Sequence, residues 1–283
     1  MIGCKTFRTA LAALALSAAA LPLQASERVV VIGGALAEIV HALGQVDRLV
    51  GRDTTSSYPP AITELPDVGY MRALSPEGLL RLAPDLIIAD EGAGPPETID
   101  LMLRAEVPFI RIDAAYDEAG VLARIHDVAA ALEVEDGGEA LATDVAARFD
   151  ALTEARDAID TPLSAMFILS AQGGRIMASG ANTAASGILA LAGVENAVTG
   201  FEGYRLLTDE AVAAAAPDAI IMMDRDGDHA LSDTQIIAHP ALGITPAGQA
   251  MRVVRMDGLF LLGFGPRTPD AALALMDALK GGN

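Results

Sequence analysis

The chain has 283 residues, 52% of them hydrophobic and 20% charged, so it is long enough for two globular domains and does not have the composition of a disordered protein. Its 38 acidic residues outnumber 19 basic ones. This excess argues against nucleic acid as a partner, because a phosphate backbone is bound by clustered Lys and Arg.

The N-terminus has the pattern of a secretory signal peptide. Lys5 and Arg8 precede an apolar stretch over about residues 10–21, which is followed by Pro-Leu-Gln-Ala ending at Ala25. A buried helix is the alternative, but it would carry polar residues on one face, and this stretch has none. We expect cleavage after Ala25, which also removes Cys4, the only cysteine, and leaves a soluble exported chain without disulfides.

The next segment predicts an α/β domain over residues 26–136. A β-branched run at 28–32 ends at Gly33-Gly34 and is followed by helical spacing, the pattern of a strand, a turn and a helix. Further strands are predicted at 46–50, 86–89 and 107–112. Strands that alternate with helices favour a parallel sheet.

A long amphipathic helix is predicted over about residues 138–159, inside a linking segment that we place at 137–161. A helix of roughly twenty residues spans about 30 Å, enough to bridge two lobes. No linker rich in Pro, Gly or Ser separates the halves, so we expect the lobes to keep a nearly constant separation.

A second α/β lobe is predicted over 162–283. Its strands are expected at 165–170 and 219–223, the first of them leading into a glycine turn at Gly173-Gly174. Its predicted helices are 184–192, closed by Gly193, and a terminal helix at about 269–279.

The chain also contains an internal repeat. Residues 74–88 return as residues 207–221, and each copy has a Ser or Thr N-cap, an acid in the first helical turn, Pro-Asp and an aliphatic strand. Two similar units imply two similar lobes. The predicted fold is therefore α/β, with two Rossmann-like lobes joined by a long helix and a ligand cleft between them.

Sequence motifs for enzymes are weak. The four histidines have no metal-ligand spacing; they are His41, His126, His229 and His239. Gly33-Gly34 after a strand is compatible with a nucleotide-binding site, but Ala35 and Glu38 occupy the positions where the dinucleotide-binding motif requires glycine. We therefore expect a protein that is not an enzyme, and keep a nucleotide-using enzyme as the alternative from another class.

The loop before the first repeat copy is more informative. Gly69 precedes Tyr70, and Arg72 follows two residues later, at the end of an α/β sheet where such folds gather ligands. Fe³⁺ and a neighbouring guanidinium both favour the phenolate, and tyrosinate is an axial ligand of ferric haem. The alternative is that Tyr70 packs its ring on the surface and Arg72 is merely solvated, and the residues alone leave the choice open.

Four segments carry a resemblance to a known family: residues 68–78, 180–185, 193–197 and 261–269. The sequence resembles the periplasmic haem-binding proteins of bacterial ABC importers, a branch of the cobalamin and siderophore binding proteins. The resemblance implies a periplasmic chain that binds ferric haem b, with Tyr70 as the axial ligand, Arg72 as its partner and Met71 beside them. Arg267 would meet a haem propionate.

One departure concerns the second lobe. Some family members carry a histidine near its strand-to-glycine turn, where residues 170–174 of this chain read Ser-Ala-Gln-Gly-Gly. A second protein ligand and a second haem are therefore open questions. Tyr204 is a substitute ligand, or a structural residue.

The resemblance also gives the duplicated acids a role. Glu77 and Glu210 occupy matching first helical turns, and in this class such acids dock on arginines of a dimeric inner-membrane permease that works with an ATPase. Helix-start chemistry alone is the alternative. We expect a monomer that carries haem, with a ferric siderophore or a corrinoid as the alternative ligand.

Overall fold

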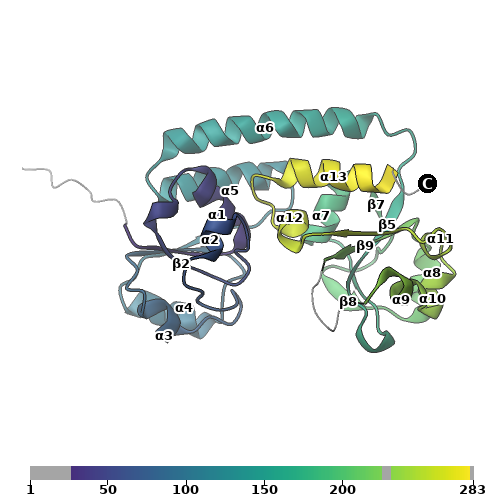
Figure 1. Cartoon of the computed structure of the whole chain (residues 1–283), viewed down its shortest axis with the longest axis horizontal. Coiled ribbons are helices and arrows are strands. Elements are labelled where there is room, and N and C mark those ends of the chain that lie inside the picture. Colours follow the sequence, from purple (N-terminus) through teal and green to yellow (C-terminus); the bar gives the residue numbers. More distant parts are fainter. Residues whose placement is uncertain (1–26, 225–230, 281–283) are drawn as a thin grey trace, which may run out of the picture.

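The computed structural model describes residues 27–224 and 231–280. The predicted signal peptide, with Cys4, lies outside the described residues. Figure 1 shows two α/β lobes side by side, with the long helix α6 (Glu135–Asp157) running along one side of both. The predicted α/β class with two lobes is confirmed.

The first lobe is built on a four-stranded parallel sheet in the order β2-β1-β3-β4. Its strands are β1 (Val29–Ile32), β2 (Leu49–Arg52), β3 (Leu86–Asp90) and β4 (Phe109–Ile112). Its helices are α1 (Gly34–Ala42), α2 (Pro60–Thr63), α3 (Pro76–Leu80), α4 (Pro96–Arg104) and α5 (Glu118–Ala131).

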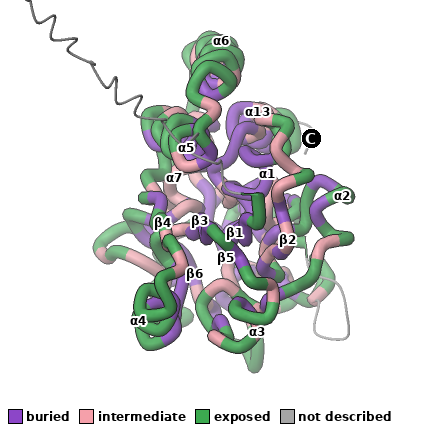
Figure 2. Tube along the Cα trace, turned by 90° about the vertical axis from the view of Figure 1, so that its left-hand side faces the viewer, coloured by how far each residue is buried: buried purple, intermediate pink, exposed green. Residues whose placement is uncertain are grey.

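Both faces of this sheet are covered, as a parallel sheet requires. Val29 and Val31 of β1 point to the core that α1 and α5 share, whereas Val30 and Ile32 point to the core under α3 and α4. Figure 2 shows the buried strands between helices whose outer faces are exposed. Helix α5 was not predicted from the sequence.

The strand predicted at 46–50 is wrong in its first half. Val46–Arg48 form a 3₁₀ turn (η1), and the strand begins at Leu49. The cause is tertiary: the guanidinium of Arg48 donates to the carbonyl oxygen of Leu132 at 2.7 Å, just past the end of α5. Within the turn, the Arg48 amide donates to the carbonyl oxygen of Gln45 at 3.2 Å.

The second lobe has a six-stranded sheet in the order β10-β9-β5-β6-β8, with β7 also paired to β5. Its strands are β5 (Ser164–Ser170), β6 (Met177–Ser179), β7 (Glu195–Asn196), β8 (Tyr204–Leu206), β9 (Ala219–Met223) and β10 (Val253–Met256). Its helices are α7 (Ala184–Leu191), α8 (Asp209–Ala215), α9 (Asp233–Ile237), α10 (Pro240–Gly243), α11 (Pro246–Gln249), α12 (Gly258–Leu262) and α13 (Thr268–Lys280).

This sheet is mixed rather than purely parallel. β6 and β8 run antiparallel to their neighbours. The predicted glycine turn is the reason: Gly173 and Gly174 have φ of 62° and 71°, which reverses the chain directly after β5. Beyond that hairpin, β9 and β10 pair in parallel with β5 on its other side.

Helix α6 belongs to both lobes. It packs on α5 of the first lobe and on α13 and α7 of the second. Val145, Phe149 and Leu152 are buried on its inner face, within a hydrophobic cluster that reaches from β1 to α13. Because this core is continuous across the lobes, their relative position is supported by packing and not by a single flexible strand of chain.

The two copies of the repeat adopt the same local structure. Ser75 caps α3 by accepting a hydrogen bond from the Gly78 amide, and Thr208 caps α8 by accepting one from the Ala211 amide. In each copy the short helix is followed by one strand, β3 after α3 and β9 after α8.

The Pro-Asp pairs of the repeat also match. The preceding residues Ala83 and Ala216 have left-handed backbones, with φ of 44° and 41°. Asp85 then accepts a hydrogen bond from the Arg28 amide at 3.0 Å, and Asp218 accepts one from the Ser164 amide at 2.9 Å. In both lobes the repeat therefore fastens the start of a neighbouring strand.

Candidate functional site

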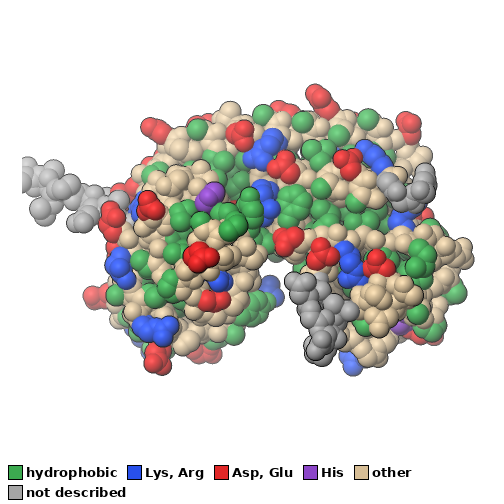
Figure 3. All heavy atoms as spheres, viewed as in Figure 1, with side chains coloured by type: hydrophobic (Ala, Val, Ile, Leu, Met, Phe, Trp, Pro, Cys, Tyr) green, Lys and Arg blue, Asp and Glu red, His purple; other side chains and the backbone are tan. Residues whose placement is uncertain are grey.

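A cleft of about 580 Å³ lies between the lobes, within the size range of small-molecule sites. Figure 3 shows the molecule hollowed between the lobes on the side away from α6. The first lobe contributes Gly33, Gly34, Ala35, Thr54, Thr55, Ser57, Met71, Arg72, Asp90, Tyr116 and Arg124, and the second contributes Asn182, Thr183, Ala184, Gly203, Tyr204, Met223, Asp257, Gly258, Leu259, Leu262 and Gly263.

Most of these residues follow the carboxyl ends of parallel strands. Gly33 follows β1, Thr54 follows β2 and Asp90 ends β3, while Met223 ends β9 and Asp257 follows β10. Ligands of open α/β sheets bind at such ends. The two sheets therefore present their ligand-binding edges to one another.

Tyr70 does not line this cleft, whereas the two residues that follow it, Met71 and Arg72, do. Tyr70 is 46% exposed. Gly69 has φ of 97°, and its amide donates to the Asp67 carboxylate at 2.7 Å. This turn holds the loop in a defined conformation and leaves the phenol accessible.

Two further tyrosines stand in the cleft wall. Tyr204, on β8, is half-buried, and burial raises its pKa, against a hydrogen bond with Thr183. Tyr116, from the loop after β4, has its pKa raised by burial and by Asp90. The positive charge of Arg72 opposes both shifts, so Arg72 is within electrostatic reach of a phenol from each lobe.

Tyr116 was missed by the sequence reasoning. Its ring packs edge-on against Phe264, with the centroids 5.3 Å apart, so it joins the first lobe to the second. An aromatic residue four positions after a predicted strand, at the carboxyl edge of a sheet, was the available signal.

Arg124 and Asp90 both line the cleft and form an ion pair that was not predicted from the sequence. The Arg124 guanidinium is 3% exposed and donates to the Asp90 carboxylate at 2.8 Å. It also donates to the backbone carbonyls of Asp113 at 3.0 Å and Gly263 at 3.1 Å. Arg124 thus connects α5 of the first lobe to the end of α12 in the second.

The turn after β1 is hydrogen-bonded to the side chain of Asp53. The buried Asp53 carboxylate accepts hydrogen bonds from the Gly33 amide, the Thr55 amide and the Ser56 hydroxyl, all at 2.8 to 2.9 Å. A nucleotide phosphate would need that position and those donors. The internal carboxylate therefore argues against the nucleotide-using alternative.

Gly34 marks a close approach of the two lobes. A Cβ at this position would lie 2.5 Å from the Thr55 carbonyl oxygen and 2.5 Å from a methyl group of Leu259 in α12. We expect Gly34→Ala to lower the free energy of unfolding by about 1–3 kcal/mol through overpacking, measured by urea denaturation. Gly137→Ala is the control, because a Cβ there meets only Leu43 at 3.7 Å; equal losses would contradict the assignment.

Arg267 is not brought to the cleft wall. Its guanidinium donates to both carboxylate oxygens of Glu38, which is 6% exposed, on α1. Burial raises the pKa of Glu38, and Arg267 opposes that shift. The sequence predicts that Arg267 meets a haem propionate, whereas in the structure one edge of its guanidinium is hydrogen-bonded to Glu38.

Glu77 and Glu210 lie where the repeat predicts them. They occupy the first turns of α3 and α8, and both are exposed. Figure 1 shows α3 and α8 on different lobes, on the side away from α6. Hydrogen bonds from its own backbone amide and from the Thr208 hydroxyl lower the pKa of Glu210.

Within residues 27–224 and 231–280, no three His, Cys, Asp or Glu side chains are grouped closely enough to hold a metal ion. Of the histidines, His229 lies outside the described residues, and His239 caps α10. In that same part of the chain, no helix has the length and apolar character needed to span a membrane.

Comparisons with known proteins agree with this geometry. The model of the family described as periplasmic binding protein matches residues 29–258. The structure resembles that of the periplasmic haem-binding protein BhuT in complex with two haems, at 44% identity and a TM-score of 0.87, over 90% of this chain and 98% of that one. It also resembles apo RhuT from Roseiflexus sp. RS-1, at 36% identity and a TM-score of 0.86, over 91% and 99% of the two chains.

A third solved structure, the periplasmic haem-binding protein HutB of Vibrio cholerae, is 29% identical with a TM-score of 0.80, over 89% of this chain and 98% of that one. Among curated proteins, a vitamin B12-binding protein of Yersinia pestis is 33% identical over 107 residues. That match spans 38% of this chain and 38% of the relative.

Proposed function

Because the chain belongs to the periplasmic binding protein family, matched over residues 29–258, we propose that it binds ferric haem in the cleft between its lobes and delivers it to an inner-membrane ABC permease. The observation that carries this proposal is the likeness to a haem-bound structure at 44% identity over 90% of the chain. The protein works as a periplasmic carrier and not as an enzyme, and it exchanges its ligand when docked on the permease and its ATPase.

Tyr70 is the proposed axial ligand. What supports this proposal is that Tyr70 is exposed, directly follows the Gly69 turn, and precedes by two residues Arg72, which lines the cleft. Fe³⁺ and Arg72 both stabilise a phenolate. Burial raises the pKa of Tyr204 and works against its phenolate, which makes Tyr204 the second choice.

The remaining cleft chemistry suits a porphyrin. Met71 and Met223 contribute soft apolar surface from opposite lobes, and Leu259 and Leu262 extend it. Burying a flat apolar ring of this kind stabilises a complex by several kcal/mol, at about 25 cal/mol per Å². Arg72 supplies the cation for a propionate, which matters in a chain with net charge −19.

Permease docking is proposed to involve Glu77 and Glu210. Both carboxylates are exposed at the starts of helices that the internal repeat makes equivalent, one on each lobe. A carboxylate at a helix N-terminus is favoured by the unpaired amides there. Two acids in equivalent positions suit a permease built from two subunits.

A corrinoid is the second candidate ligand, because the curated relatives include vitamin B12-binding proteins. A corrinoid brings its own axial ligand to its metal, so it would leave Tyr70 without a role in coordination. The two candidates therefore differ in what they require of residue 70.

A titration distinguishes them. We expect hemin, added to the purified apo protein, to give a saturable Soret band with the charge-transfer bands of a five-coordinate ferric phenolate, and the breakpoint to give the number of haems. Cyanocobalamin and a ferric siderophore, added in parallel, are expected to leave intrinsic fluorescence and calorimetric heats unchanged. Saturable cobalamin binding with no change in the hemin spectrum would overturn the proposal.

A further inference from the structure

Arg267 and Glu38 form an ion pair between the lobes. Arg267 lies at the start of α13, and its Nε donates to Oε2 of Glu38 at 2.9 Å while Nη2 donates to Oε1. These residues are 229 positions apart in the chain. Glu38 is on α1 of the first lobe, and its side chain is 6% exposed, so the pair is nearly withdrawn from water on the acid's side.

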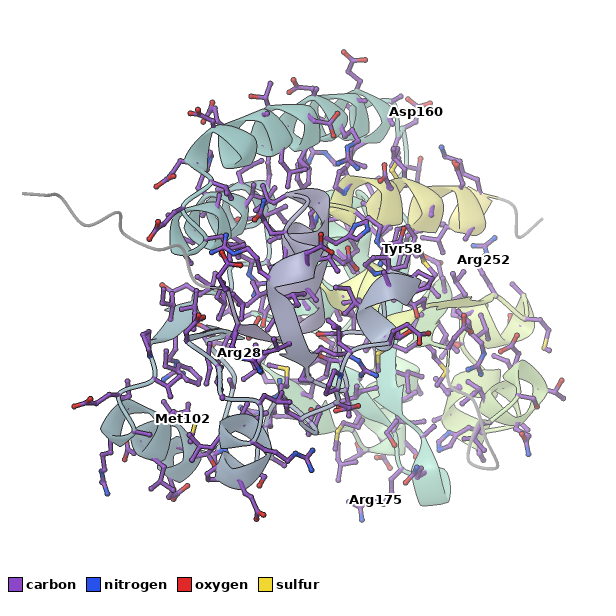
Figure 4. All side chains as sticks on the ribbon, turned by 60° about the vertical axis from the view of Figure 1, so that its left-hand side comes forward. Arg28, Tyr58, Met102, Asp160, Arg175 and Arg252 are labelled. Atoms are coloured by element: carbon purple, nitrogen blue, oxygen red, sulfur yellow. The ribbon has the colours of Figure 1, made fainter. Side chains whose placement is uncertain are left out.

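Two aromatic rings enclose the guanidinium. The Cζ of Arg267 lies 3.8 Å from the ring centroid of Tyr58 and 4.9 Å from that of Phe260. Tyr58 belongs to the loop after β2 in the first lobe, whereas Phe260 belongs to α12 in the second. Figure 4 shows Tyr58 beside α12 and α13. A planar guanidinium is suited to this combination of a forked ion pair and stacked rings.

The pair is adjacent to the cleft. Ser57 precedes Tyr58 and lines the cleft, and Leu259 does the same next to Phe260. Any widening of the cleft on this side therefore separates Tyr58 from Phe260 or Glu38 from Arg267. Separation would leave the Glu38 carboxylate buried without its cation, a costly arrangement.

We propose that the Glu38–Arg267 pair, with Tyr58 and Phe260 as its walls, is an interlobe clamp that sets the cleft width and retains bound haem. The ligand in this statement rests on the proposed function; the clamp itself rests on the contacts above. Arg267 then acts as a positioning residue: one edge of its guanidinium is used by Glu38, and Arg267 does not line the cleft.

The clamp is tested with a double-mutant cycle of Glu38→Gln and Arg267→Met. The readouts are the rate of haem transfer to an excess of a haem-scavenging protein and the interlobe distance in the apo protein. The distance is measured between spin labels at Asp100→Cys on α4 and Ala214→Cys on α8, in the chain that starts after Ala25 and therefore lacks Cys4. Residues 100 and 214 are exposed and lie on different lobes.

Each single variant is expected to raise the haem dissociation rate about tenfold, which corresponds to about 1.4 kcal/mol, and to widen the distance distribution. The double variant is expected to match the singles, since both break one interaction. The Soret and charge-transfer bands stay unchanged, because Tyr70 is intact. Asp233→Asn is the matched control: its pair with Arg255 at 2.6 Å lies within the second lobe, so rate and distance should not move.

Three outcomes overturn the clamp. The first is an unchanged distance in both single variants, whatever their stability. The second is a release from the double variant that is clearly faster than from Glu38→Gln alone, which would give Arg267 a contact with haem that is independent of Glu38. The third concerns Tyr58→Leu, which is used if the charge variants fail to fold, because Tyr58 is 42% exposed. An unchanged release rate and an unchanged distance in this variant would overturn the clamp. If wild-type protein binds no hemin, the proposed function fails, and the distances still test the clamp.

Discussion

Replacing Tyr70 with phenylalanine is expected to weaken haem binding by about a hundredfold, or about 2.7 kcal/mol, and to abolish the phenolate-to-iron charge-transfer bands. Phenylalanine keeps the ring and removes only the oxygen that would coordinate Fe³⁺. Tyr70 is 46% exposed, so the fold should tolerate the change. Hemin titration monitored by absorbance gives both the affinity and the bands.

Two other cleft phenols are matched controls. Tyr116→Phe and Tyr204→Phe remove the same atom from residues that line the cleft. We expect both to keep the charge-transfer bands and to change the affinity by less than about tenfold. If Tyr204→Phe loses the bands and Tyr70→Phe keeps them, the iron ligand belongs to the second lobe and the assignment of Tyr70 is wrong.

The local features of the fold were accessible from the sequence. The strand predicted at 219–223 is β9 with the same bounds, and the helix predicted at 184–192 is α7, one residue shorter. The repeat predicted two lobes because its helix caps act through contacts within three residues, although the aspartates that follow reach backbone amides more than fifty positions away. Periodicity, caps and turn residues encode that level of structure.

The contacts between the lobes could not be predicted from local sequence patterns. Arg267 and Glu38 meet across 229 positions, and no local pattern pairs them. The same residue types are compatible with a propionate partner or with an ion pair, and only the three-dimensional structure shows Glu38 bonded to Arg267. Sequence reasoning therefore named Arg267 as a cation near the cleft without its partner.

The residues that line the cleft were also only partly predicted from the sequence. Met71, Arg72 and Tyr204 were named from the sequence and do line the cleft, because each is close to a motif that the repeat places. Tyr116 and Arg124 line it as well and were missed. Arg124 sits in the middle of a helix that has no strong cap signal apart from Asp117, and its partners come from three other segments of the chain.

Arg124→Met is expected to lower the free energy of unfolding by about 3–5 kcal/mol, the usual cost of removing one partner from a buried ion pair. Methionine fills similar volume, but it leaves Asp90 without its cation and the Gly263 carbonyl without this donor. Because those partners lie on different lobes, the loss should be felt by the whole molecule in one transition. Urea denaturation of the apo protein, followed by far-UV circular dichroism, measures it.

Arg148→Met separates this effect from the loss of any arginine. Arg148 pairs with Asp144 and Asp270, but its side chain is 32% exposed, and such pairs contribute about 0–1 kcal/mol. Arg124→Lys should fall between the two, since a lysine keeps the charge near Asp90 and loses the fork that reaches the backbone carbonyls. If Arg124→Met costs no more than Arg148→Met, the Arg124–Asp90 pair does not hold the lobes together, and that role is left to the continuous core under α6 and to the Glu38–Arg267 pair.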